Sequence, residues 1–160
     1  MVWLAAAAMG AGLTSCDDPP AEIGIAGVQV EEEQQEMARW QPVSDKTPVA
    51  LFLARVAANE PDLQDSSEAV SHYANLLRDA RRHYIETPRM ISNRLIQGGD
   101  YLTEGGTPMP LDTLLIELES IGGKEPRSFA DDLHHYINLR DAGADHEAAI
   151  ADLARAGERR

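Results

Sequence analysis

The side chains best suited to chemistry in this sequence are five arginines that lie close together along the chain. They fall within 17 residues and make up five of the 14 lysines and arginines in the protein: Arg78, Arg81, Arg82, Arg89 and Arg94. A guanidinium group presents a planar fork of donors that suits carboxylates and phosphates. The cluster therefore predicts either internal ion pairs or a positive site for an anionic ligand or an acidic segment of a partner protein.

The five histidines do not form a strong catalytic or metal-binding pattern, and none lies in an HExxH motif. Asp131 and His135 are four residues apart, so they share one helix face, and with His146 they imitate part of a metal site. Such an Asp–His pair is more often a surface contact, so we predict no metal. The sequence also has no GxSxG motif and no phosphate-binding glycine loop. We therefore assign no catalytic residue and no cofactor.

The overall charge narrows the classes of partner. The chain has 160 residues, 27 of them acidic and 14 basic, and a net charge of −13 at pH 7. Nucleic-acid binding needs a basic face, so no nucleic acid is expected as a partner. The same charge repels anionic lipid head groups, so attachment to a membrane requires a separate anchor.

The first 16 residues carry the pattern of such an anchor. Residues 3–13 are uncharged, which is the length of a signal-peptide apolar segment and too short for a membrane span. Leu13-Thr14-Ser15-Cys16 follows and resembles the lipobox of bacterial lipoproteins. The resemblance implies that residues 1–15 are a signal peptide, and that Cys16 becomes the acylated mature N-terminus. It leaves open whether the inner or the outer membrane holds the anchor.

The elements that position the arginines are predicted to be helices. We expect an all-α fold, an irregular bundle of about five or six short helices over residues 47–160, after an extended and acidic tether over residues 16–46. Gly98-Gly99 is expected to weaken one helix or to end it. The predicted helix starts lie at caps or at prolines of the first turn: Thr47-Pro48, Asp65, Thr87-Pro88, Pro110, Ser128 and Asp145.

Two of the arginines are predicted to lie on apolar helix faces. Arg81 projects beside the stripe of Val70, Ala74 and Leu77. Arg94 projects within an arc that is expected to face the core: Met90, Ile91, Leu95, Tyr101 and Leu102. Because an unpaired buried charge costs several kcal/mol, an arginine in this position needs a carboxylate or carbonyl partner.

These patterns together predict a non-catalytic lipoprotein, anchored by lipid in the cell membrane and facing the periplasm. It is expected to act as an accessory or docking partner of another protein of the cell envelope. Two alternatives stay open. One is a binder of a small anionic ligand through the Arg81 and Arg94 region, and the other is an enzyme whose site no motif marks.

Overall fold

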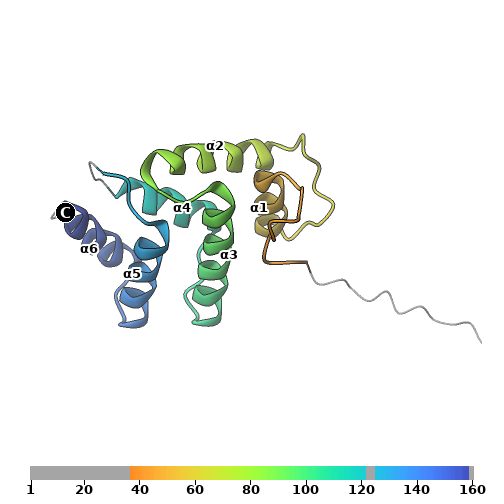
Figure 1. Ribbon diagram of the computed structural model, residues 1–160. Coiled ribbons are helices and arrows are strands. Elements are labelled where there is room, and N and C mark those ends of the chain that lie inside the picture. The colour runs from red at the N-terminus through yellow and green to blue at the C-terminus, as the bar shows by residue number, and fades with distance from the viewer. Residues whose placement is uncertain (1–36, 122–124, 159–160) are drawn as a thin grey trace, which may run out of the picture. The chain divides into compact units, whose positions relative to one another are not determined.

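The computed structural model describes residues 37–121 and 125–158, which belong to one unit of residues 35–160. This part of the chain forms six α-helices and no strand, so the predicted all-α fold is confirmed (Figure 1). None of the helices described is long and apolar enough to cross a membrane. The helices are α1 (Val49–Ala58), α2 (Glu68–His83), α3 (Pro88–Glu104), α4 (Leu111–Ser120), α5 (Phe129–Asp141) and α6 (His146–Glu158).

Three of the six helices, α3, α5 and α6, start at the predicted caps, whereas α1 and α4 begin one residue after Pro48 and Pro110 and have no side-chain cap. Ser128 Oγ accepts the amide of Asp131 at 3.2 Å, and Asp145 Oδ1 accepts the amide of Ala148 at 2.8 Å. These side chains satisfy amides that have no partner within their own helices. Thr87 caps α3 in the same way, with Pro88 at the first helical position.

The predicted start of α2 at Asp65 is wrong. The helix begins at Glu68, and its cap is Ser67, whose Oγ accepts the amide of Val70 at 3.3 Å. The amide of Ser67 donates to the carbonyl of Gln64 at 3.0 Å, which closes a turn and keeps Asp65 outside the helix. Serine and aspartate are equally good caps, so the local turn decides between them.

Gly98 and Gly99 do not end α3, which continues to Glu104. A Cβ atom on Gly98 would lie 2.9 Å from the methyl carbons of Leu133 on α5. A Cβ atom on Gly99 would collide with the side chain of Leu111 on α4. The glycine pair therefore allows α4 and α5 to pack closely against α3, which offsets its low helix propensity.

Three residues that were predicted to face the core are exposed instead. Met90 is 51% exposed, Tyr101 is 49% exposed, and Ala74 on α2 is also exposed. On α3 the buried stripe is rotated away from Met90 and Tyr101, because α3 packs on α1, α2, α4 and α5 through its other faces. The buried apolar residues of α3 are Ile91, Leu95, Ile96 and Leu102.

A segment before α1, which we call the strap (residues 39–45), is held along α3. The side chain of Arg39 forms a forked ion pair with Asp100. The backbone amide of Gln41 donates to Asn93 Oδ1 at 2.9 Å, and Asn93 Nδ2 donates back to the Gln41 carbonyl at 3.0 Å. Both Gln41 and Asn93 are buried. The end of the predicted tether thus contacts the helical domain.

Candidate docking site

The structure separates the five arginines into three environments. Arg78, Arg81 and Arg82 are exposed near the C-terminal end of α2. Arg89 is partly buried and Arg94 is exposed, and both lie on α3. The internal ion pairs that were one alternative for Arg81 and Arg94 are not formed with any described residue, because both side chains lie on exposed parts of their helices.

Arg89 has a structural role in holding the strap. Its Nη1 donates to the carbonyl of Pro42 at 2.9 Å, and its Nη2 donates to the carbonyl of Asp45 at 3.4 Å. Asp45 in turn accepts the amide of Thr47 at 2.8 Å. Hydrogen bonds from Thr47 lower the pKa of the Asp45 carboxyl, and the charge of Arg89 adds to this effect. The guanidinium group of Arg89 thus has a structural role: it fixes the strap to α3.

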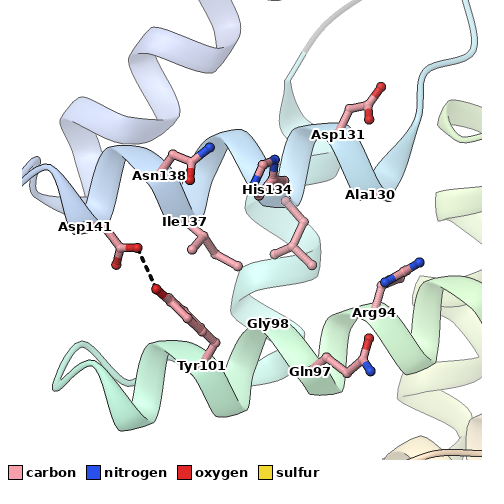
Figure 2. A pocket seen from close by; sticks show the side chains of 11 residues that line it. Arg94, Gln97, Gly98, Tyr101, Ala130, Asp131, His134, Ile137, Asn138 and Asp141 are labelled. Atoms are coloured by element: carbon pink, nitrogen blue, oxygen red, sulfur yellow. Dashed lines mark hydrogen bonds between the residues drawn. The ribbon is translucent and has the colours of Figure 1, made fainter.

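Arg94 lines a groove of about 520 Å³ between α3 and α5 (Figure 2). Gly98 and Leu133 contribute to its lining, and Ile137 points from α5 toward α3. Arg81 does not line this groove, so Arg81 and Arg94 do not share this site. The remaining lining residues are mostly polar: Gln97, Tyr101, Ala130, Asp131, His134, Asn138 and Asp141.

The groove carries charged side chains of both signs, with Asp131 on α5 at the same end as Arg94 (Figure 2). Arg94 lies at one end and, among the described residues, makes no ion pair (Figure 2). At the other end Tyr101 donates its hydroxyl to Asp141 Oδ2 at 2.8 Å. This hydrogen bond and the negative charge of Asp141 raise the pKa of Tyr101. An open groove with polar walls, some apolar lining and charged groups of both signs is suited to holding a segment of another protein.

The most deeply buried ion pair involves residues that sequence reasoning missed. Arg127 Nη2 and Asp132 Oδ2 are 2.7 Å apart, and their side chains are 10% and 9% exposed. Arg127 also donates to the carbonyl of Ile121 at 2.6 Å, and its guanidinium lies 5.7 Å from the ring centre of Tyr84. One signal was present in the sequence. Asp132 falls in helical phase with the buried stripe of α5, where an ionised side chain needs a partner.

Tyr84 and Glu86 extend this interior polar network. Tyr84 donates its hydroxyl to the Leu118 carbonyl at 2.6 Å, and burial raises the pKa of its phenol. The buried Glu86 carboxylate accepts the amides of Phe129 at 3.0 Å and Ala130 at 3.1 Å. Glu86 therefore caps α5 from another part of the chain, and its negative charge lies at the positive end of that helix.

Glu119 on α4 is a third acidic group with limited exposure, after Asp132 and Glu86. Its Oε1 is buried and accepts no hydrogen bond from the described residues. Burial, together with the negative charge of Asp79 on α2, raises the pKa of Glu119 to about 7. This carboxyl therefore titrates near neutral pH.

Three of the five histidines, His72, His135 and His146, make pairwise contacts with described side chains. His135 Nε2 is 3.5 Å from Asp152, and His146 Nδ1 is 2.9 Å from the hydroxyl of Tyr136. Asp131 is exposed and lines the groove instead. In residues 37–121 and 125–158, no group of three or more metal-ligating side chains is arranged to hold a metal ion.

Comparison with known proteins adds one finding to this geometry. The MoxZ family model matches residues 50–158, which covers nearly the whole of the six-helix region. No curated protein and no solved structure matches the chain. Cys16 and the predicted signal peptide lie outside both the matched and the described residues.

Proposed function

Because the chain belongs to the MoxZ family, we propose that it is an accessory protein of a methanol-oxidation system and acts by binding another protein of that system. The family match supports the accessory role, and the matched residues include the helices that form the groove. In this proposal the helical domain contributes a recognition surface and the reaction itself takes place on the partner.

The groove between α3 and α5 is the observation that supports docking. Its lining combines partly exposed apolar atoms with polar side chains, and Arg94 has no ionic partner among the described residues. Interfaces commonly combine an apolar centre with a polar rim and are enriched in arginine and tyrosine. Arg94 and Tyr101 are the residues of this groove best suited to anchoring a partner segment.

The proposal also includes a lipid anchor on Cys16 and a location on the periplasmic side of the cell membrane. The lipobox-like sequence Leu13-Thr14-Ser15-Cys16 supports this part. An anchor of this kind would hold the groove near other proteins of the envelope.

Deletion of the gene in its own host tests the accessory role. We expect the deletion strain to lose methanol-dependent oxygen uptake, while oxygen uptake on a substrate other than methanol is unchanged. The wild-type gene should restore methanol oxidation, and Arg94→Glu with Tyr101→Ala should restore it poorly. The control variant is Arg155→Glu, because Arg155 is exposed and lies on α6. Arg55→Glu would be unsuitable as a control, because Arg55 donates to the Leu63 carbonyl.

Unchanged methanol oxidation in the deletion strain would contradict the accessory role. Equal complementation by the groove variant and by wild type would contradict docking in the groove.

A Cys16→Ser variant tests the anchor separately. We expect the wild-type protein in the membrane fraction with the mass of a diacylglycerol adduct, and the variant without that adduct. An unmodified wild-type chain would exclude lipidation.

A further inference from the structure

The outer face of α2 carries three exposed arginines in an otherwise acidic protein. Arg78, Arg81 and Arg82 occupy positions i, i+3 and i+4 of one helix, so their side chains are surface neighbours. The protein has a net charge of −13, and these residues are three of its 14 lysines and arginines. We call this surface the α2 arginine face.

The ion pairs on this face leave most of its positive charge uncompensated. Arg78 Nε and Arg82 Nη1 both approach the same oxygen of Asp79, at 3.6 and 3.4 Å, and their side chains are 63% and 71% exposed. Shared, exposed pairs of this kind contribute little to stability. Arg81 forms no ion pair with any residue that the structure describes.

The same face is open and nearly free of competing carboxylates. Ser71, Ala74 and Asn75 precede the arginines on this side of α2, and all three are exposed. Figure 1 shows α2 with α1, α3 and α4 on one side of it, and these are the helices on which α2 packs. The other side therefore offers three guanidinium groups beside small neutral side chains.

From this surface we infer that the α2 arginine face binds an acidic segment of a partner protein, through carboxylate side chains that engage the guanidinium forks. This inference goes beyond the docking proposed for the groove, because it assigns a second binding surface and names the chemistry of its partner. Guanidinium groups bind carboxylates in a bidentate geometry, and Arg81 is available to do so. Charge complementarity also speeds the encounter of the two proteins.

An acidic protein segment suits this face better than an anionic membrane does. At physiological ionic strength, charges interact over a distance of about 8 Å, so a narrow segment is attracted by the arginines alone. A flat anionic bilayer would also face the rest of a protein whose net charge is −13, which repels it. The inference therefore predicts binding of acidic peptides and weak binding of anionic vesicles.

The test uses the full chain with Cys16→Ser, so that no acyl chain contributes to binding. The probe is a capped peptide of ten glutamates, titrated by calorimetry at 50 mM salt, and a peptide of ten glutamines is the uncharged control. We expect binding of the glutamate peptide only. Arg81→Glu should weaken it roughly five- to ten-fold, since removal of one charge-assisted contact approaches a tenfold change.

Arg155→Glu is the control for the change of charge, because Arg155 is exposed like Arg81 but lies on α6, where it pairs with Asp152. It changes the net charge equally and should leave peptide affinity within about two-fold. Circular dichroism checks that Arg81→Glu is folded. Arg81→Gln removes the positive charge without adding a negative one, so it serves as a second variant if Arg81→Glu has a folding defect. In spectra of amide resonances, the peptide should shift signals of α2 and leave those of the groove unchanged.

Absence of peptide binding, or equal weakening by Arg81→Glu and Arg155→Glu, would overturn the inference. Arg81-dependent binding of vesicles with 30% phosphatidylglycerol, without peptide binding, would also overturn it and assign the face to a membrane. These results do not depend on methanol oxidation. The proposed function fails if deletion of the gene leaves methanol oxidation intact, whatever the peptide titration gives.

Discussion

Arg127 and Arg81 are the same residue type in opposite environments. Arg127 is nearly buried, where it pairs with Asp132 at 2.7 Å and donates to a backbone carbonyl. Arg81 is exposed on α2 and has no ionic partner among the described residues. Buried charges require partners, whereas exposed charges stay hydrated at little cost. The interior network therefore maintains the fold, and the α2 arginine face is free to bind a partner.

The largest effect is expected when the buried pair is broken. Asp132→Ala leaves the Arg127 guanidinium without its carboxylate, and we expect a loss of about 3–5 kcal/mol in the free energy of unfolding. Urea denaturation followed by circular dichroism measures it. Asp79→Ala removes the exposed carboxylate beside Arg78 and Arg82 and should cost less than about 1 kcal/mol. Equal losses in the two variants would contradict the contrast between interior and surface.

A smaller effect is expected at Glu86, which joins the chain after α2 to the start of α5. Glu86→Ala removes the acceptor for the amides of Phe129 and Ala130, one of which is buried. We expect a loss of about 1–3 kcal/mol, the cost of leaving such groups unsatisfied. Hydrogen exchange should show faster exchange at the first turn of α5. Glu86→Gln keeps an acceptor oxygen and should lie between wild type and Glu86→Ala, and a Gln variant as unstable as Ala would argue against capping.

In the described part of the fold, the features that were predicted correctly are those that depend only on neighbouring residues in the sequence. Ser128 and Asp145 cap their helices as predicted, because a short polar side chain before an amphipathic stretch satisfies free amides without help from the rest of the chain. Met90 and Tyr101 were misplaced because helical periodicity indicates an apolar face but not which side of α3 its neighbours cover. That orientation depends on tertiary packing.

The candidate sites were predictable only in part, for the same reason. The arginine cluster was visible as a sequence feature, yet its division between α2, the strap and the groove depends on contacts across the fold. Arg89 meets the carbonyl of Pro42, which lies 47 residues away along the chain. Glu86 and Phe129 are 43 residues apart in sequence. Nothing in the residue types alone brings such distant positions together.

Glu119 offers a test in which pH changes the interior and leaves the arginines charged. Its pKa is about 7 in the folded protein, against an ordinary value of 4.5 for a glutamate, so the folded state holds the proton more tightly than the unfolded chain does. Stability should therefore fall as pH rises from about 4.5 to 7, and then remain lower. Glu119→Gln should remove this fall and be more stable than wild type at pH 8. Glu117→Gln, on the same helix, should keep the slope, and a wild-type slope in Glu119→Gln would exclude Glu119 as its source.

The smallest effect on stability is expected on the α2 arginine face, where binding should change most. Arg78 is largely exposed, and its closest carboxylate oxygen is 3.6 Å away on Asp79. Arg78→Ala should change the free energy of unfolding by less than about 0.5 kcal/mol, because an exposed pair of this kind contributes little and alanine favours the helix. The same variant should weaken binding of the glutamate peptide. Stability by urea denaturation and affinity by calorimetry are measured on the same preparation. A large loss of stability with unchanged affinity would mean that this arginine supports the helix, and the difference between Arg127 and the exposed arginines would then be one of degree.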